Sequence, residues 1–201
     1  MYDAEENRIG CQQQMKALGL VFGSAPTMNL QVKRIKKGVR QRYWTLRNLK
    51  RNGFTVPELL KVYTTMIRPV AKYDAPVFHS SLTDEQDEAI ERLQNHALKC
   101  IYGPGKSGRK MRKLSGLPTL RARREEICDK FAAKCVGHPR LEEWFPKKTA
   151  RASRRGTNRE EFLETKARCK RLFDSPLFYF RRRLNGKIRK SYGKRNEEYR
   201  T

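Results

Sequence analysis

The pattern with the clearest chemical meaning is a run of cations between Lys33 and Arg51. This stretch holds nine Lys or Arg residues and no acidic residue. In an α-helix each residue advances by about 100°, so six of these cations and one aromatic residue fall on a single stripe. The stripe consists of Lys33, Lys36, Lys37, Arg40, Trp44, Arg47 and Arg51. A helix of about 24 residues is about 36 Å long, roughly one turn of duplex, so the cations could follow a phosphate backbone while Trp44 stacks on a base or ribose.

Two alternatives stand beside this interpretation: the cations form a solvated basic surface, or Trp44 lies at the edge of the hydrophobic core. Composition favours phosphate contact for the cations. The chain has 46 Lys and Arg against 21 Asp and Glu, a net charge of +25, and such a charge opposes compaction unless a polyanion compensates it. For Trp44 considered alone, the core position is favoured.

The stretch Gly103-Pro104-Gly105-Lys106-Ser107 begins a second basic region. It resembles a phosphate loop, but Cys100 stands where the signature needs glycine, and a helix rather than a strand precedes it. We interpret it as a helix end and a flexible basic turn. Further candidate phosphate contacts lie here and near the C-terminus: Lys106, Arg109, Lys110, Arg181, Arg182 and Arg183.

No catalytic residue, metal site or cofactor is predicted. Cys128 and Cys135 are seven residues apart on one helix face, which is typical of core thiols, and the close Cys pairs of zinc sites are absent. His79 and His96 have no acidic or thiol partner at motif spacing. The six Asp residues are scattered, so no local pattern supplies the converging carboxylates of a two-metal site.

The apolar spacing predicts a mainly α fold. The segment Lys16–Phe22 has strand character, and apolar residues at helical spacing then predict helices over 27–53, 83–103 and 119–137. Another helix begins with a capping box at Thr55, and Pro69 must kink or break it. The expected buried residues of the last helix are Leu120, Ile127, Phe131 and Cys135.

Charge divides the chain near residue 146. Residues 1–146 carry a net charge of +12, and residues 147–201 carry +13 on about a quarter of the length. We therefore expect a short N-terminal strand or hairpin in 1–26, a small helical bundle in 27–146, and a basic C-terminal arm in 147–201 that is partly helical or disordered and largely extended.

Composition also bears on location. The five Cys residues are too few and odd in number for a secreted disulfide scaffold. The longest apolar run is far shorter than a membrane span, and the N-terminus lacks the features of a signal peptide. We expect an intracellular protein of the nucleus or cytoplasm, neither secreted nor bound to a membrane.

Several segments, read in order over residues 14–185, resemble the C-terminal portion of non-long-terminal-repeat (LINE-like) retrotransposon reverse transcriptases. The most specific is Leu60–Val70, which contains Ile67-Arg68-Pro69. The other matching stretches are Met15–Phe22, Leu46–Lys50, Tyr73, Ala75–Val77, His79-Ser80, Ile90–Gln94, Ala97–Lys99, Leu117–Leu120, Arg123–Glu125, Lys130–Ala132, Trp144–Pro146, Ser175–Leu177 and Leu184-Asn185.

This resemblance implies a palm-edge strand remnant in 1–26 and a thumb-like domain in 27–146. In this family the thumb holds the template–primer duplex, and the catalytic aspartates lie upstream, so none is assigned to this chain. The resemblance implies a nucleic-acid-binding fragment without a polymerase active site of its own, whose partners are an RNA/DNA or DNA duplex and a palm and fingers portion in another chain. The alternative is a basic RNA-binding structural protein of ribosomal type.

Overall fold

The computed structural model describes residues 14–23, 27–147, 162–164 and 167–198 of the chain. These residues are mainly helical, with a two-stranded hairpin followed by a helical bundle, which confirms the predicted fold class. They form two compact units. Unit 1 comprises the described residues of Met1–Ala71 and Leu82–Leu117, and unit 2 those of Lys72–Ser81 and Pro118–Thr201. None of the helices in the described ranges combines the length and the apolar character needed to span a bilayer.

The N-terminal strand character resolves into a hairpin of β1 (Gln14–Ala17) and β2 (Leu20–Gly23), paired antiparallel with Ala17 opposite Leu20. The two turn residues, Leu18 and Gly19, both adopt positive φ, at 47° and 87°. Such a turn matches the right-handed twist of the flanking strands. The Val21 N–H donates to Gln31 Oε1 at 3.1 Å, which anchors the hairpin to the first helix.

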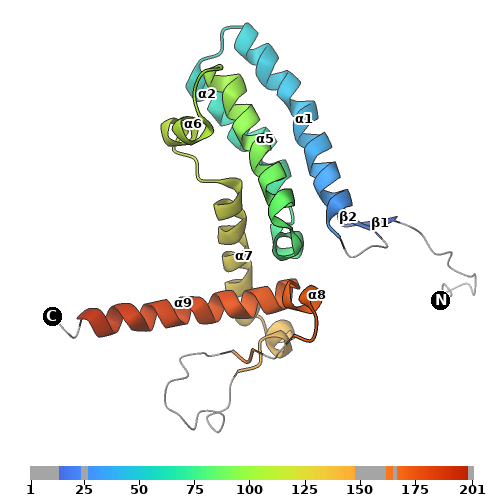
Figure 1. The fold of residues 1–201 in the computed structure, drawn as a ribbon, viewed down its shortest axis with the longest axis vertical. Coiled ribbons are helices and arrows are strands. Elements are labelled where there is room, and N and C mark those ends of the chain that lie inside the picture. Colours follow the sequence, from blue (N-terminus) through green and yellow to red (C-terminus); the bar gives the residue numbers. More distant parts are fainter. Residues whose placement is uncertain (1–13, 24–26, 148–161, 165–166, 199–201) are drawn as a thin grey trace, which may run out of the picture. The chain divides into compact units, whose positions relative to one another are not determined.

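Helices α1 (Asn29–Arg51) and α5 (Asp84–Tyr102) pack side by side and run parallel, as Figure 1 shows. Three levels of hydrogen bonds set their register. Near the N-termini Gln86 Nε2 donates to Asn29 Oδ1 at 2.7 Å, and midway Tyr43 Oη donates to the Leu93 carbonyl at 2.8 Å. Near the C-termini Lys50 Nζ donates to the carbonyls of Cys100 and Ile101, at 2.9 Å each.

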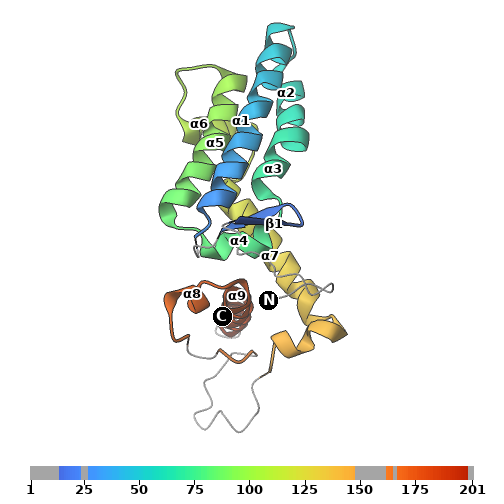
Figure 2. The same ribbon diagram turned by 90° about the vertical axis from the view of Figure 1, so that its right-hand side faces the viewer.

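After α1 the chain runs back through α2 (Val56–Val62), a π-helical turn (Tyr63–Ile67) and α3 (Arg68–Lys72) before it reaches α5. The Thr55 capping box is confirmed, because Glu58 accepts from both the Thr55 N–H and its hydroxyl. The π-turn ends two residues before Pro69, and the Arg68 N–H donates to the Tyr63 carbonyl five residues back. The wider turn accommodates the proline, which cannot donate a backbone hydrogen bond, without ending the helical path. Helix α2 contacts both α1 and α5, and Figure 2 shows the three helices together.

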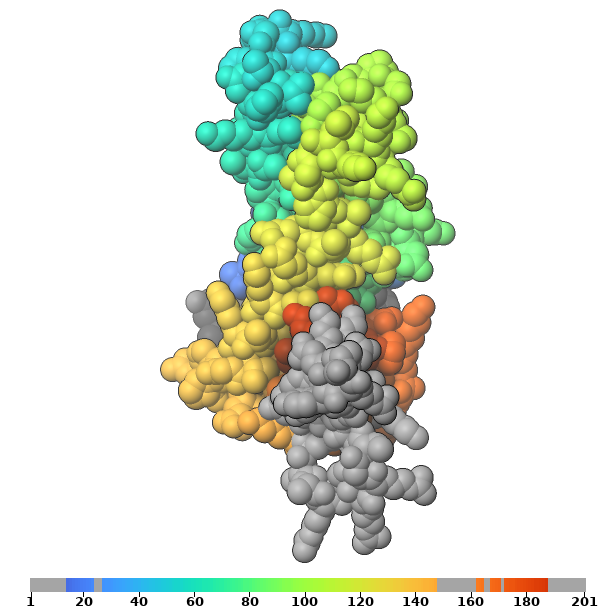
Figure 3. Space-filling model, turned by 90° about the vertical axis from the view of Figure 1, so that its left-hand side faces the viewer, coloured from blue at the N-terminus to red at the C-terminus, as the bar shows by residue number. Residues whose placement is uncertain are grey.

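The helix end and turn expected over Gly103–Ser107 are present, with Gly103 as the C-cap of α5, and a helix that was not predicted, α6 (Gly108–Ser115), follows the turn. Ser107 caps it by accepting from the Lys110 N–H, and Met111 is fully buried. Arg112 Nη1 donates to Asn95 Oδ1 of α5 at 2.7 Å. Arg112 also lies 3.8 Å from Glu91 of α5. One apolar anchor and the polar contacts of Arg112 therefore hold this very basic helix on the surface of unit 1, where it appears in yellow-green in Figure 3.

Unit 2 is built on α4 (Ala75–Phe78), a 3-10 turn (His79–Ser81), α7 (Leu120–Val136), a second 3-10 turn (Pro139–Trp144), α8 (Lys170–Phe173) and α9 (Pro176–Glu198). Thr119 caps α7 at the start of the helix predicted over 119–137, because its hydroxyl accepts from the Ala122 N–H. The buried face of α7 differs from the prediction, since Phe131 is 42% exposed and Ile127 only partly buried. The buried residues are Leu120, Arg124, Cys128, Ala132 and Cys135. A buried arginine interrupts the apolar pattern, so the periodicity of apolar residues indicated a face rotated from the true one.

The boundary expected at residue 146 is not where the structure divides the chain, and the arm beyond it is not largely extended in its described part. Phe162 and Phe180 pack with Phe145, Cys128 and Cys135 in the core of unit 2. The fully buried side chain of Asn185 on α9 accepts from the Phe162 N–H and donates to the Phe162 carbonyl, both at 3.0 Å. Residues 1–13, 24–26 and 148–161, over which these domain predictions also extend, lie outside the described residues.

We expect Asn185→Ala to destabilise unit 2 by about 2 kcal/mol, because it leaves the buried N–H and carbonyl of Phe162 without their partner. The measurement is urea unfolding followed by the fluorescence of Trp144 in a Trp44→Phe background. Gly186→Ala is the control on the same helix: its Cβ would meet nothing within 4 Å, so it should be neutral or mildly stabilising. An unfolding midpoint for Asn185→Ala equal to that of the control would contradict this role of Asn185.

Candidate nucleic-acid interface

The predicted cationic stripe is present on a continuous helix. The buried face of α1 is formed by Gln31, Val32, Ile35, Val39, Tyr43 and Leu46. At about 100° per residue, the stripe occupies the sector next to Tyr43, on the side that borders α5. All its members are exposed except Lys36, which is partly buried. From Lys33 to Arg51 the stripe rises about 27 Å along the helix axis.

The stripe cations are not neutralised within the part of the chain that the structure describes. No carboxylate in the described ranges lies within ion-pair distance of any of them, and only Arg47 makes a polar contact, with His96. Two cations of α1 outside the stripe instead make hydrogen bonds within the chain. Lys50 binds the last carbonyls of α5, and Arg42 donates to the Gly38 carbonyl at 2.7 Å. The sequence run of nine cations thus separates into structural cations and cations that face solvent.

Trp44 lies in the middle of the stripe and is 69% exposed. The interpretation of Trp44 as a core-edge residue is therefore wrong. The neighbouring Tyr43 takes the core position, and burial raises its pKa well above the usual range of a tyrosine. Arg40 and Arg47 lie one helical turn on either side of Trp44. This arrangement leaves the indole face accessible among cations, as stacking on a base requires.

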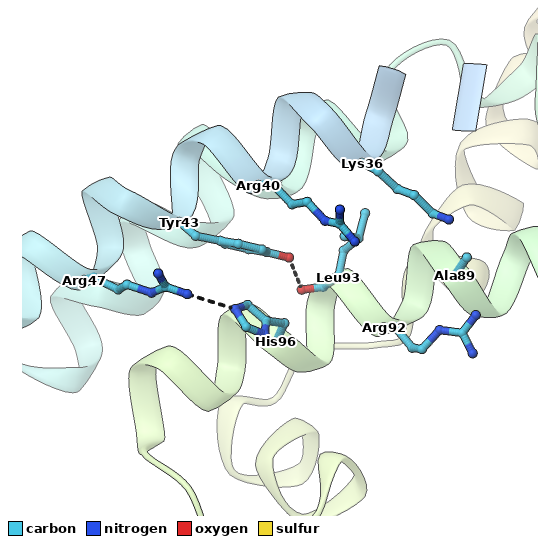
Figure 4. Close-up of a pocket in the computed structure, with 8 residues that line it drawn as sticks. All are labelled: Lys36, Arg40, Tyr43, Arg47, Ala89, Arg92, Leu93 and His96. Carbon is cyan, nitrogen blue, oxygen red and sulfur yellow. Dashed lines mark hydrogen bonds between the residues drawn. The ribbon is translucent and has the colours of Figure 1, made fainter. Parts of the chain in front are cut away.

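A cleft of about 470 Å³ opens between α1 and α5 beside the stripe. Its lining residues are Lys36, Arg40, Tyr43, Arg47, Ala89, Arg92, Leu93 and His96. Figure 4 shows Lys36 and Arg40 extending from α1 toward α5, with Arg47 directed at the ring of His96. No carboxylate lines the cleft. The two packed helices thus gather four permanent cations and an imidazole in one recess.

Sequence reasoning missed Arg92 and His96. They are spaced by four residues next to the apolar stripe of α5, which places them on one face, but the spacing does not say which neighbour that face meets. Arg92 also lies 3.5 Å from Glu88 in a highly exposed ion pair. Because water screens this pair, Glu88 reduces the attraction of Arg92 for an external anion only slightly. The spacing of Arg92 and His96 therefore points to a binding site only when the packing of α1 against α5 is known.

The cleft has a strongly positive electrostatic environment that acts on His96. Burial lowers the pKa of His96, and the charges of Arg47, Lys99 and Arg40 lower it further. The imidazole is consequently neutral at pH 7, and its Nε2 lies 3.4 Å from Arg47 Nη2, which can donate to it. A field that disfavours a bound proton also favours a bound anion at the same place.

The remaining basic candidates of unit 1 lie on the turn before α6 and on its first residues. Lys106, Arg109 and Lys110 are all exposed, and the Lys106 Nζ lies 5.7 Å from the centre of the Tyr102 ring. None of the three lines the cleft between α1 and α5. They form a separate basic surface on α6, and the structure does not bring them into one site with the stripe.

The structure does not support Arg181, Arg182 and Arg183 as a phosphate-binding group, because each makes intrachain contacts in unit 2. Arg181 is buried and its Nε donates to the Trp144 carbonyl at 2.8 Å. Arg182 covers the ring of Phe173 at 3.5 Å and donates to its carbonyl.

Arg183 binds both carboxylate oxygens of Asp129, at 2.9 and 2.7 Å, and lies 3.5 Å from Glu125. Burial alone would raise the pKa of Asp129, but the hydrogen bonds from Arg183 and Lys187 outweigh it and lower that pKa. Sequence charge therefore pointed to phosphate binding where the fold uses all three arginines as contacts from α9 to neighbouring segments of unit 2.

Candidate metal ligands do not converge in the described residues. No group of three or more His, Cys, Asp or Glu side chains in those ranges has the geometry to hold an ion. Cys128 and Cys135 are buried free thiols of the unit 2 core, as their spacing predicts. Burial raises the pKa of Cys128 to about 12, which makes it a poor nucleophile.

We expect His96 to make the stability of unit 1 depend on pH in the acidic range. Its folded-state pKa lies below the unfolded value of about 6.5. The unfolded chain therefore binds the proton more readily, and stability is lost as the pH falls from about 6.5 through the folded-state pKa. His96→Gln should flatten this loss, measured by thermal unfolding at a series of pH values. An identical pH dependence in both proteins would show that protonation of His96 does not destabilise the folded state.

Comparisons with known proteins give no indication of what this site binds. No family model, no curated protein and no solved structure matches this chain. The chemistry of the stripe and the cleft is therefore the basis on which a function can be assigned.

Proposed function

We propose that unit 1 binds nucleic acid by its phosphate backbone, without reading the base sequence. The observation that carries this proposal is the row of six exposed or partly exposed cations on α1, none of which is paired with a carboxylate of the described residues. Releasing the counterions of nucleic acid is the main driving force for such binding. A helix is suited to it because the backbone that carries the cations is already ordered before contact, so only their side chains lose freedom on binding.

The spacing of the stripe fits a backbone rather than a compact anion. Its length of about 27 Å approaches one helical turn of a duplex. Main-chain hydrogen bonds hold α1 straight, and Lys50 fixes its C-terminal end to α5. Phosphates along one strand can therefore meet successive cations, with Trp44 placed to stack at a base or sugar between them.

We extend the proposal to the role that the resemblance to LINE-like reverse transcriptases implies. In that role unit 1 holds a template–primer duplex as a thumb does, and a palm and fingers portion in another chain supplies catalysis. The features that support this role are the basic helical bundle and the ordered similarity over residues 14–185. Binding an RNA/DNA hybrid at least as tightly as a DNA duplex of the same sequence would favour it.

Affinity should depend steeply on salt. If about six phosphates are neutralised, the association constant should drop about 10³-fold between 50 and 200 mM salt. Filter binding or fluorescence anisotropy with a labelled duplex measures this slope. A flat salt response would exclude backbone clamping.

Reversing charges on the stripe should weaken binding more than the same change elsewhere. The triple variant Lys33→Glu, Lys37→Glu and Arg40→Glu should lose at least about 100-fold in affinity and keep its circular dichroism spectrum. The matched control is Lys16→Glu, Arg34→Glu and Lys61→Glu, three exposed cations of unit 1 outside the stripe. Both variants change the net charge by the same amount, so equal losses would show that only total charge matters.

The alternative function, a basic RNA-binding structural protein of ribosomal type, predicts a different outcome. Such a protein would prefer folded RNA over either duplex and would co-sediment with ribosomal particles. Competition between a labelled hybrid duplex and folded RNA, with sedimentation from lysate as a second readout, separates the two functions.

A further inference from the structure

We propose that the cleft between α1 and α5 is a seat for a phosphate dianion, the terminal phosphomonoester of a nucleic-acid strand. The proposal deepens the function proposed above and rests on it for the identity of the ligand. Lys36, Arg40 and Arg47 belong both to the stripe and to the lining of the cleft. The proposal assigns the cleft a terminal phosphate, whereas the stripe cations outside the cleft, Lys33, Lys37 and Arg51, contact internal phosphodiesters.

The charge of the cleft exceeds what one internal phosphate can balance. Lys36, Arg40, Arg47 and Arg92 line a single recess with no carboxylate among the lining residues. An internal phosphodiester carries one negative charge, whereas a phosphomonoester approaches two near neutral pH, since its second pKa is about 6. The dianion is the better match in charge density. The volume of about 470 Å³ accommodates a terminal phosphate together with part of its nucleotide.

The geometry of the cleft is set by packing rather than by the flexible cations themselves. Tyr43 is buried at its floor, and its hydroxyl is committed to the Leu93 carbonyl of α5. The ring of His96 packs against Tyr43 with centroids 4.6 Å apart. Both walls are thus held at a fixed separation, and the charged ends of Lys36 and Arg40 reach across the opening toward α5 (Figure 4).

His96 gives the seat a proton-dependent component. Burial is the largest cause of the lowered pKa of His96, and the charged groups that lower it further are Arg47 and Arg40 from α1 and Lys99 on its own helix, all cationic. Arg92, also cationic, lines the same cleft from α5. A dianion in the cleft offsets this field and makes a protonated imidazole favourable, so binding should be accompanied by proton uptake on His96. Arg47, which contacts the neutral ring in the free protein, becomes available to the ligand.

The first test compares otherwise identical single-stranded oligonucleotides that end in a 5′-phosphate, a 3′-phosphate or hydroxyl groups only. We expect one of the phosphorylated ends to improve the affinity of the full chain about tenfold over the hydroxyl form. Arg40→Gln should abolish this preference, and Arg34→Gln, an exposed cation of α1 outside the cleft, should keep it. Equal affinities for all three ends, or a preference that survives Arg40→Gln, would overturn the proposal.

The second test uses sulfate, a dianion that does not titrate in the range where histidine does. The pKa of His96, followed by NMR of the histidine ring nitrogens, should rise by about one unit at saturating sulfate. An unchanged pKa at high sulfate would overturn the proposal, because a dianion in the cleft must act on the adjacent ring. Competition between inorganic phosphate and the terminally phosphorylated oligonucleotide shows whether the phosphate group alone is enough for binding in the cleft.

The two proposals can fail separately. Loss of duplex binding with a retained phosphate-end preference would remove the clamping function and leave the seat. Steep salt-dependent duplex binding without a phosphate-end preference would remove only the seat.

Discussion

The parallel packing of α1 against α5 is the constraint on which the candidate site depends. Its register is held at the N-termini by Asn29 and Gln86, midway by Tyr43 and Leu93, and at the C-termini by Lys50 with the last α5 carbonyls. These contacts bring the basic edges of two helices together. Like charges on facing helices repel, so an apolar and hydrogen-bonded seam must outweigh that repulsion in the free protein.

The cations of this chain fall into two groups that composition alone does not separate. Lys50, Arg112 and Arg183 bind carbonyl, amide or carboxylate oxygens of their own chain and stabilise the fold. Lys33, Lys37 and Arg51 on α1 face solvent. The high net charge is therefore partly structural, and only its uncompensated fraction is available to an external polyanion.

Sequence patterns predicted the elements of unit 1 well and those of unit 2 less well. In unit 1 the capping box at Thr55 is present, and the helix predicted over 83–103 is α5, with Thr83 as its N-cap. In unit 2 the buried Arg124 lies on the inner face of α7, so the pattern of apolar residues did not predict that face correctly. Asn185, a polar residue in a basic segment, gives no hint that it clamps Phe162 from 23 positions away. Long-range polar contacts of this kind leave no periodic trace.

The amino-acid sequence by itself determined that α1 is a helix with an apolar side and a cationic side, because the 3.6-residue period places each type of residue on its own face. It also determined the excess of positive charge. Only the tertiary structure decided that Tyr43 rather than Trp44 enters the core, and that Arg92 and His96 join the α1 cations around one cleft. Local periodicity describes a single helix, whereas a cleft depends on which faces of two helices meet, and that is settled by packing along the whole chain.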